Sequence, residues 1–406
     1  MNIKFLLTTS FIATTLITQA QDANKTFAIT GDGNHDFMWM NIRQVDIGSG
    51  KIVQNIYDRQ KTAFVMMDAD TKAQSLAGQL PTQSLVAAAA YDKNQNKLFF
   101  TPMRIGELRW LDLNAKGSTQ KYYTVTSSLL NTYESLNDEA NHFTRMVIAA
   151  DGNGYALTND ASRLVKFTTG KKVTITDLGA VLDDDANKTV SIKNKCTSWG
   201  GDMIADAYNN LYIISANHYV FELDLKTKKA KYIGNISGLP ANYSTNGAAV
   251  DAEGNVVVSS ANTFAGYYKF NMKDFVAVKI EGSDMVYNAS DLANGNLLYK
   301  KEADAARTFA DFKPVVPVIT NEAHIFPNPV TNSEFKISFD GQQAGRYNVA
   351  ITDLSGKSIM NRTITTTSKT QIETVPLNRK IAKGVYMVKV TDANNKFIFT
   401  ERIVVQ

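Results

Sequence analysis

A repeated two-part unit constrains the fold of this chain more than any other feature of its sequence. Five segments share a strand ending near an Asp, a turn rich in Asn or Gly, and a second strand of aromatic and β-branched residues: AYDKNQNKLFF at Asp92, AADGNGYAL at Asp151, ADAYNNLYII at Asp206, VDAEGNVVVS at Asp251 and SDLANGNLLY at Asp291. Asp and Asn suit such turns because their side chains bond nearby backbone groups, and Gly adopts positive φ without steric cost. Each segment is therefore predicted to be a β-hairpin.

A second element follows these hairpins at a nearly constant distance. The segments RWLDL at Asp112, RLVKF at Lys166, FELDL at Asp224 and YKFNM at Asn271 lie 20, 15, 18 and 20 residues after the preceding marker Asp. The same spacing predicts a partner for Asp291 near residue 309, where RTFADF contains Asp311. It also predicts a turn near residue 28 for RQVDI at Asp46, where GDGN contains Asp32. The number of units then becomes six.

Units of four short strands predict an all-β protein whose residues 21–312 form a β-propeller. Six blades are favoured, and five or seven also fit because the longer connections at residues 59–90 and 179–200 could hide or mimic strands. A two-sheet sandwich is the main alternative, but it has no need of a recurring unit. In their arrangement the repeats resemble extracellular NHL-like and SMP-30-like propellers, without a family-defining motif.

The N-terminus and the overall composition narrow the class of protein. Residues 1–20 combine an early Lys4, an apolar run and the small-residue site Thr18-Gln19-Ala20, which predicts a signal peptide cleaved after Ala20. The run is shorter than the roughly 20 residues that span a bilayer, so no transmembrane segment is predicted. Cys196 is the single cysteine, which excludes an intramolecular disulfide and is expected to be a buried apolar side chain rather than a nucleophile. With 43 Lys and Arg against 39 Asp and Glu, and no basic block, nucleic acid is not an expected partner.

Hard-oxygen clusters are the candidate metal ligands. The segment GDGNHDF with Asp32, His35 and Asp36, and the DDD run at 183–185, could hold a cation such as calcium. A polar hairpin turn and a solvated loop are the preferred interpretations, so no cofactor is predicted and a bound calcium ion is left open. The chain lacks the G-x-S-x-G, H-E-x-x-H and P-loop motifs, and no catalytic residue is assigned.

Two segments that precede inner strands are the best candidates for a ligand face. Asn141, His142 and Arg145 lie in EANHFTRM, and Trp199 and Asp202 lie at the equivalent place one unit later in SWGGD. Loops at the central face of a propeller commonly bind ligands, so these five residues are the candidates to contact one. Packing between blades is the preferred interpretation, because aromatic residues at blade boundaries mostly fill core.

The pattern of strands and turns changes after a proline-containing stretch, which predicts a linker at 313–322. The strands EFKISFD, RYNVAITD, KSIMNRTIT, GVYMVKVTD and KFIFTERIVV alternate apolar and polar residues, which predicts a small immunoglobulin-like β-sandwich at 323–406. The segments 344–357 (AGRYNVAITDLSGK) and 383–396 (KGVYMVKVTDANNK) echo each other. We expect them to face each other across the two layers of the sandwich.

This C-terminal region resembles the type A C-terminal sorting domain of proteins exported by the type IX secretion system of Bacteroidetes. The resemblance rests on FPNPV with Phe326, Pro327, Asn328 and Pro329, on DLSGK, on KGVYMVKV with Gly384, Tyr386 and Lys389, and on the terminal ERIVVQ. It implies an address read by the translocon and sorting machinery at the outer membrane. It further implies release of the cargo, or its attachment to surface lipopolysaccharide.

Two functions follow for a secreted or cell-surface propeller. The first is a binding module for a glycan, a peptide or another surface protein, and the second is an extracellular hydrolase or lyase that uses the central face. Converging carboxylates with raised pKa values at the propeller axis would favour the enzyme. An aromatic, weakly charged face would favour the binding module, and a passive surface-layer component would show neither.

Overall fold

The computed structural model describes residues 23–33, 35–74, 78–130, 138–282, 287–311, 324–339, 341–368, 371–377 and 381–406. The chain divides between Thr308 and Phe309 into two compact units, which are described separately below. The signal peptide predicted at 1–20 and the linker predicted at 313–322 lie outside the described residues.

The Asp-containing turns form hairpins as predicted in four of the five segments. These hairpins are β5–β6, β9–β10, β14–β15 and β18–β19, each paired in antiparallel register. The carboxylate of Asp92, Asp151, Asp206 or Asp251 accepts the backbone N–H two residues ahead at 2.8–3.0 Å. Turn chemistry therefore explains why Asp recurs at these four positions.

Most of the strands of the first unit follow one another within a sheet, as expected for a propeller. The sheets are numbered along the chain, and the first is described below with the fifth. The second sheet contains β5 (Val86–Asp92), β6 (Lys97–Pro102), β7 (Glu107–Asp112) and β8 (Gln120–Thr126), with β4 (Phe64–Asp68) beside β8. The third contains β9 (Phe143–Ile148), β10 (Gly154–Thr158), β11 (Leu164–Phe167) and β12 (Ile175–Gly179). The fourth contains β14 (Asp202–Ala205), β15 (Leu211–Ile214), β16 (Tyr219–Asp224) and β17 (Lys229–Asn235), with β13 (Leu182–Asp183) beside β17.

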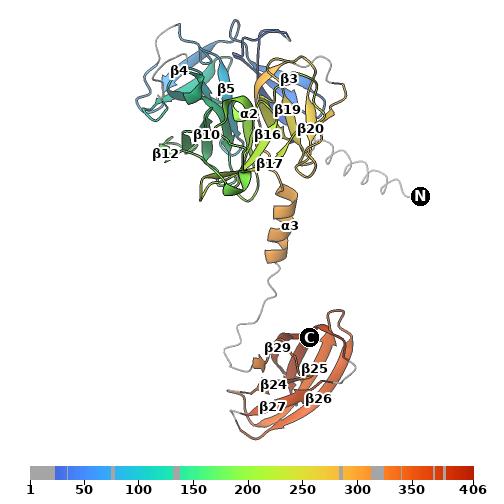
Figure 1. Cartoon of the computed structure of the whole chain (residues 1–406). Helices are drawn as coiled ribbons and strands as arrows, with labels where there is room; N and C mark the ends of the chain where they lie inside the picture. The colour runs from blue at the N-terminus through green and yellow to red at the C-terminus, as the bar shows by residue number, and fades with distance from the viewer. Residues whose placement is uncertain are drawn as a thin grey trace, which may run out of the picture. The chain divides into compact units, whose positions relative to one another are not determined.

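The first and fifth sheets close the ring. The fifth contains β18 (Gly247–Val250), β19 (Val256–Ser259), β20 (Tyr268–Phe270) and β21 (Val278–Lys279). The first takes β1 (Lys25–Thr30), β2 (Asn41–Asp46) and β3 (Lys51–Tyr57) from the start of the chain and β22 (Ala289–Ala293) from near the end of this unit. Strands β1 and β22 pair antiparallel, with Phe27 opposite Ala293. In Figure 1 the blue strand β3 accordingly lies near the gold strands β19 and β20.

The hydrophobic core repeats the same ring. Each of five clusters of buried side chains joins two neighbouring sheets: first and second, second and third, third and fourth, fourth and fifth, and fifth and first. The inner strands β5, β9, β14, β18 and β22 also neighbour one another in a closed circle. The fold class predicted from the repeats, an all-β propeller, is confirmed.

The described residues form five propeller sheets rather than the six units counted from the sequence, and five is one of the numbers that the sequence left open. The half-unit at Asp46 and the unit at Asp291 are two parts of one sheet, so counting each as a unit adds one. The strand expected at Asp311 is instead part of helix α3 (Lys300–Asp311). Its alanines and the Lys300–Asp304 ion pair, four residues apart, favour a helix there.

Short helical segments lie in the connections between sheets. They are η1 (Glu139–Asn141), η2 (Asp185–Asn187) and α2 (Lys195–Ser198). Cys196 lies in α2 and is exposed, which corrects the expectation of a buried thiol. The reason is its position in a surface connection, where no sheet covers it. No helix of the described residues is both long and apolar enough to cross a membrane.

The second unit is a two-sheet sandwich, as predicted. One sheet contains β23 (His324–Phe326), β24 (Glu334–Ser338) and β27 (Ile372–Pro376) in that order. The other has the order β26 (Ser358–Thr366), β25 (Gly345–Asp353), β28 (Gly384–Asp392) and β29 (Phe397–Val405). The two echoing segments form β25 and β28, which pair as neighbours in one sheet instead of facing each other across the layers. Their matching alternation places both sets of apolar side chains in the same core, including Val349, Ile351, Val388 and Val390.

Candidate functional site

One end of the propeller gathers most of the predicted site residues. In each sheet the inner strand begins at the end where the second and third strands are connected, because the first two strands run antiparallel. We call this end the loop end. It holds the β1–β2 connection at 31–40, the β19–β20 connection at 260–267, and the segments that lead into β9 and β14.

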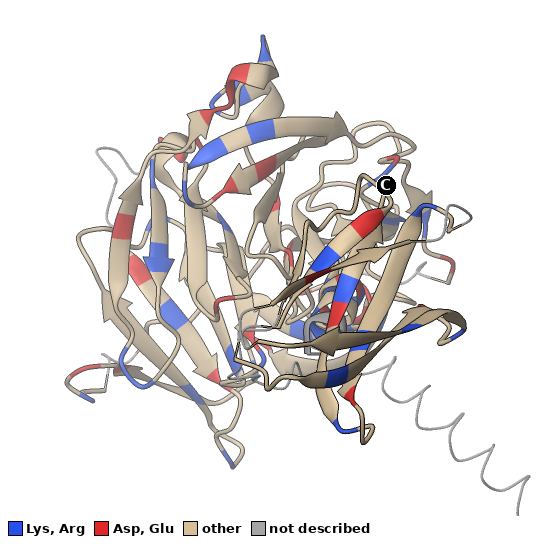
Figure 2. Cartoon of the chain, turned by 90° about the horizontal axis from the view of Figure 1, so that it is seen from below, with Lys and Arg blue, Asp and Glu red and all other residues tan. Residues whose placement is uncertain are grey.

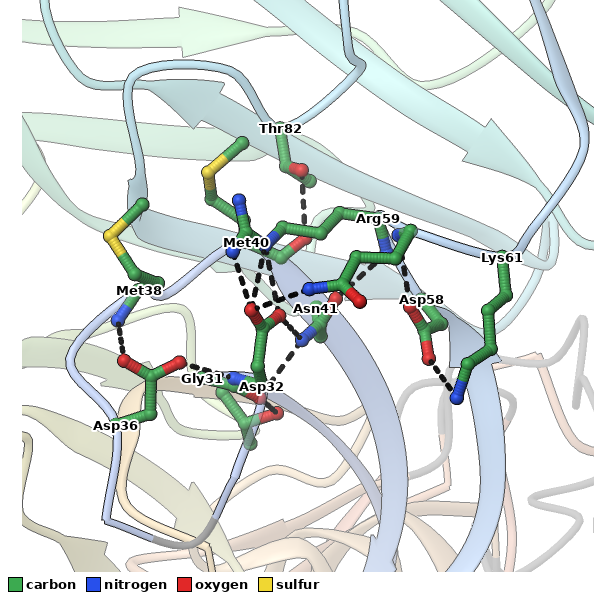
Figure 3. Close-up of polar contacts among 12 residues, drawn as sticks. Gly31, Asp32, Asp36, Met38, Met40, Asn41, Asp58, Arg59, Lys61 and Thr82 are labelled. Atoms are coloured by element: carbon green, nitrogen blue, oxygen red, sulfur yellow. Dashed lines mark hydrogen bonds and ion pairs between the residues drawn. The ribbon is translucent and has the colours of Figure 1, made fainter.

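A polar network anchors the β1–β2 connection (Figure 3). Asp32 accepts hydrogen bonds from Arg59 Nε at 2.8 Å and from Asn41 Nδ2 at 2.9 Å, and the Arg59 guanidinium also forms an ion pair with it. Asn41 is buried, and its Oδ1 accepts the Arg59 backbone N–H at 2.8 Å. Asp36 in turn accepts the Asp32 N–H at 2.8 Å. The connection is thus tied to the segment that follows β3.

The electrostatics of this network explain the role of the GDGNHDF segment. The hydrogen bond from Arg59 lowers the pKa of Asp32 to about 2, against the opposing effect of partial burial. The carboxylate is therefore ionised at neutral pH and already has a cationic partner. Gly31 is required by close approach, because a Cβ there would lie 2.5 Å from the Asp36 carbonyl oxygen.

The DDD run at 183–185 also uses its carboxylates within the protein. Asp183 accepts the Ile192 N–H and the Ser191 hydroxyl at 2.7 Å. Asp184 caps η2 through the Ala186 N–H at 2.9 Å, and Asp185 forms an ion pair with Lys229 at 2.8 Å. Among the described residues no three His, Cys, Asp or Glu side chains gather in a group that could hold a metal ion.

Exposed apolar side chains, most of them aromatic, cluster where the β1–β2 and β19–β20 connections meet. Phe37, Met38 and Phe264 are 49%, 41% and 37% exposed. The ring of Phe264 lies 4.3 Å from that of His35 and 5.6 Å from that of Phe37, and Phe37 contacts Trp39 edge-on at 6.2 Å. We call His35, Phe37, Met38, Trp39 and Phe264 the aromatic rim. It joins the first and fifth sheets at the loop end.

Hydroxyl and amide groups adjoin the aromatic rim. Asn262, two residues before Phe264, is exposed, and its Oδ1 accepts the hydroxyls of Ser244 and Ser260 at 2.7 Å. The Asn262 side-chain N–H groups donate to no other residue in the part of the chain that the structure describes. An apolar surface and a free amide donor therefore lie within one connection.

Arg145 links the two segments proposed as a ligand face. It lies on β9, is 0% exposed, and donates to the carbonyl oxygens of Gly200 at 2.9 and 3.1 Å and of Thr158 at 3.2 Å, and also to that of Ser198. Burial lowers its pKa to about 10, and the charges of Asp160 and Asp202 oppose this shift. The guanidinium therefore stays charged at neutral pH and holds the connection that enters β14.

The other predicted ligand residues differ in accessibility. His142 is buried, and desolvation lowers its pKa so that the neutral imidazole is favoured. Trp199 is half-buried, donates from Nε1 to the Lys193 carbonyl at 3.0 Å, and lies under the Lys195 ammonium at 5.1 Å. Asn141 ends η1 and is half-buried. Asn141 and Trp199 thus retain surface that a ligand could touch, whereas His142 and Arg145 are enclosed.

Two carboxyl groups lie on inner strands with no exposed surface. Asp202 on β14 accepts the Ala248 N–H of β18 at 2.6 Å and the Met203 N–H at 2.7 Å. Asp291 on β22 has no hydrogen bond to either oxygen among the described residues. Burial raises the pKa of both carboxyls well above 3.8, and the charge of Asp202 raises that of Asp291 further. The backbone of Ala89 lowers the pKa of Asp291 and so opposes this shift.

Asp291 therefore corrects the sequence analysis, which grouped it with the turn residues. It lies within β22, opposite Ile29 of β1, and makes none of the turn contacts of the other four aspartates. Asn294 takes the turn role instead, because its Oδ1 accepts the Asn296 backbone N–H two residues ahead at 3.1 Å. No local signal separates Asp291 from the turn aspartates, because its segment has the same types of residue in a similar order.

The axis of the propeller is nearly filled. Residues of all five inner strands, among them Ala89, Met146, Met203, Ala248 and Leu292, surround a space in which water could occupy about 10 Å³. That volume suffices for about one water molecule. A substrate therefore has no room in this space.

The FPNPV motif closes one edge of the C-terminal sandwich. Asn328 follows Phe326 and Pro327, and its side chain donates to the Arg402 carbonyl at 2.7 Å and accepts the Val404 N–H at 3.0 Å. After Pro329, Val330 donates to the Val404 carbonyl at 2.7 Å and accepts the Gln406 N–H at 3.0 Å. β29 is the edge strand of its sheet, and the Asn328 amide bonds to it in place of a neighbouring strand. Backbone N–H and C=O groups that would be unpaired at this edge are therefore satisfied.

The remaining motif residues fall into two groups. Tyr386, just after Gly384 at the start of β28, donates its hydroxyl to the Ala382 carbonyl at 2.7 Å, and Tyr347 on β25 donates to the Gln343 carbonyl at 2.6 Å. These equivalent bonds explain why both similar segments carry a Tyr at the same position. Lys389 instead is exposed on β28, opposite Ala350.

Comparison with solved structures finds distant likenesses. PorZ, an essential bacterial surface component of the type IX secretion system of Porphyromonas gingivalis, is 15% identical with a TM-score of 0.32, over 94% of this chain and 51% of PorZ. The chain thus spans about half the length of PorZ. Virginiamycin B lyase from Staphylococcus aureus is 8% identical with a TM-score of 0.32, over 95% of this chain and 96% of the lyase. No curated protein matches the chain.

A family model identifies the C-terminal unit more specifically. Residues 324–406 match the secretion system C-terminal sorting domain. The match begins one residue after the start predicted from the sequence, and it includes FPNPV, Gly384, Tyr386 and Lys389. Residues 324–406 of this chain are therefore a type IX secretion C-terminal sorting domain.

Proposed function

We propose that this chain is a type IX cargo whose propeller binds a neutral glycan outside the cell through the aromatic rim. The sorting domain supports the export route, which implies interaction with the secretion machinery and a secreted or cell-surface location. The observation that carries the binding function is the exposed group of Phe37, Met38 and Phe264 at the loop end. Large apolar side chains that remain exposed in a group mark interaction sites.

The chemistry around the rim favours a sugar. Aromatic rings offer flat apolar surfaces to the C–H faces of pyranose rings, and the exposed Asn262 amide can donate to a sugar hydroxyl. The Asp32–Arg59 ion pair and the hydrogen bonds of Asp36 hold the connection in place before the ligand arrives. A surface ordered in advance loses less conformational entropy on binding.

The buried carboxyls do not support the alternative of a hydrolase or lyase. Asp202 and Asp291 have the raised pKa values expected of catalytic acids, but neither has exposed surface and the axis admits about 10 Å³ of water. Attack on a glycosidic bond requires both carboxyl groups to reach the sugar. Both oxygens of Asp202 also accept backbone N–H groups, one from Met203 beside it and one from Ala248, which links β14 to β18.

The rim is tested with the double variant Phe37→Ala/Phe264→Ala. We expect the full chain to bind at least one of soluble β-glucan, α-mannan or pullulan in affinity electrophoresis, and the double variant to lose at least ten-fold in affinity. Tyr208→Ala is the matched control, because Tyr208 is an aromatic residue 56% exposed in the turn between β14 and β15. Equal binding by wild-type and double-variant protein would reject the rim as the ligand site.

The export route is tested by truncation. A chain that ends at Phe312 keeps β22 and hence the ring closure, so it should fold and remain in the periplasm of a type IX-competent host. The full chain should reach the medium or the cell surface. Export of the truncated chain would show that the sorting domain is dispensable.

A further inference from the structure

The outer face of the sheet β26-β25-β28-β29 is a surface that the fold of the sorting unit does not use. Val349 and Val388 point into the core and are buried, whereas Asn348, Ala350 and Lys389 alternate with them on the other side and are at least partly exposed. The three-stranded sheet covers only the core side. The outer face is therefore available to another molecule.

This face carries positive charge without compensation. The register places Ala350 between Asn361 and Lys389, and Lys389 beside Thr400. The same face includes Arg346 opposite Thr365, and Arg402 opposite Met387. No position paired across this face is an Asp or Glu, and its cations form no ion pair with any described residue.

A shallow hollow lies at the centre of the face. Its volume is about 490 Å³, and its lining includes Asn348, Asn361, Arg362, Thr363, Lys389 and Thr391. Amide and hydroxyl groups thus surround the Lys389 side chain. Since β25 and β29 flank β28, the strand spacing puts the strands that carry Arg346 and Arg402 about 10 Å apart, with Lys389 on the strand between them.

We propose that this face is the recognition surface of the sorting unit and that it docks on an acidic protein surface of the export machinery. The inference rests on the proposed export function. Asn328 and Tyr386 are occupied by bonds within the unit, whereas Lys389 is a motif residue that the fold leaves exposed. Spaced cations with intervening amides match carboxylates spread over a protein, while a single phosphate is bound best by donors that converge on it.

Charge reversal in the full chain tests the proposal. Lys389→Glu should lower the exported fraction at least ten-fold in a type IX-competent host, Lys389→Gln by a few-fold, and Lys389→Arg by less than two-fold. Lys336→Glu is the matched control, because Lys336 is an exposed lysine in the middle of β24 on the other sheet. It should leave export within two-fold of wild type.

Three results would overturn the proposal, and one further result separates it from the export assignment. Wild-type export of Lys389→Glu and Lys389→Gln, or an equal loss for Lys336→Glu, would show that the face is not recognised. Purified full chain is also incubated with phosphatidylcholine vesicles with and without lipopolysaccharide, and binding to lipopolysaccharide that needs Lys389 would assign the face to the lipid instead. If the chain ending at Phe312 is retained while Lys389→Glu is exported, the export function stands and only this inference fails.

Discussion

The propeller buries acidic and basic side chains, whereas the sorting unit keeps such side chains at its surface. Arg109, Arg145, Asp202 and Asp291 of the propeller are each 0% exposed. The described buried polar residues of the sorting unit are Ser338, Gln342 and Thr366, none of which is charged. A large closed ring provides backbone groups that can compensate a buried charge, while a small sandwich has too little interior for that. Charge is thus a structural component in the first unit and remains free for recognition in the second.

The buried arginines of the propeller share one task. Arg43 donates to the Gly31 carbonyl at 2.7 Å, Arg109 to the Pro81 carbonyl at 2.6 Å, and Arg145 to the Gly200 carbonyl at 2.9 Å. Each acceptor lies in a connection at the loop end. The guanidinium supplies several donors in a fixed plane, which suits a turn whose carbonyls point inward. These side chains order the end of the propeller that carries the aromatic rim.

The largest expected effect is the loss of a buried arginine. Arg145→Met should lower the free energy of unfolding of the propeller by about 3 kcal/mol, because buried carbonyl groups lose their donor. Chemical denaturation of the full chain measures it. Lys116→Met is the control, since Lys116 is exposed, and it should change stability by less than about 0.5 kcal/mol. Equal effects of both variants would remove the contrast drawn between buried and exposed charge.

The second effect is a pH dependence from Asp291. Because its pKa is raised in the folded protein, the folded state holds a proton that the unfolded chain releases above about pH 4, and stability falls as pH rises from there. Asp291→Asn should remove this contribution, so the variant should gain stability over wild type at pH 8 and match it below pH 4. Thermal unfolding between pH 3 and 8 measures it. Parallel curves for the two proteins would contradict burial of this carboxyl.

The third effect belongs to the sorting unit. Asn328→Ala removes two hydrogen bonds to β29 and should lower the stability of this unit by about 1–2 kcal/mol. The propeller should unfold as in wild type, because the two units are compact separately. Limited proteolysis followed by mass spectrometry distinguishes the units. Replacing both Pro327 and Pro329 by Gly should loosen the same edge, and it should reduce export without unfolding the propeller.

The smallest effect concerns a turn that both units use. Asp92 accepts the N–H groups of Asn94 and Gln95 at 2.8 and 3.1 Å, and Asp353 accepts those of Ser355 and Lys357 at 2.9 and 3.0 Å. Asp92→Ala and Asp353→Ala should each cost about 0.5–2 kcal/mol, as for the loss of a comparable cap. Glycan binding should survive in the folded Asp92→Ala protein. A variant of unchanged stability that no longer binds would place Asp92 in the site.

Local patterns in the sequence were sufficient for the hairpins and the sorting domain. The turn contacts of Asp151, Asp206 and Asp251 span two to four residues, so a short segment contains all the atoms that make them. The same holds for the repeated bond of Tyr347 and Tyr386 to the carbonyl four residues earlier. The sorting motifs are equally local, and the family match at 324–406 confirms that prediction.

Only the tertiary structure decided the closure of the ring and the position of the candidate site. Asn294 bonds Thr26 across 268 residues at 3.0 Å, and the pairing of β22 with β1 turns two apparent units into one sheet. The aromatic rim likewise needs Phe264 to reach His35 and Phe37 from a distant connection. Burial of Asp291 follows from the same closure, which encloses β22 on both sides. Contacts between segments so far apart depend on the packing of the whole ring, and the residues around each position do not encode them.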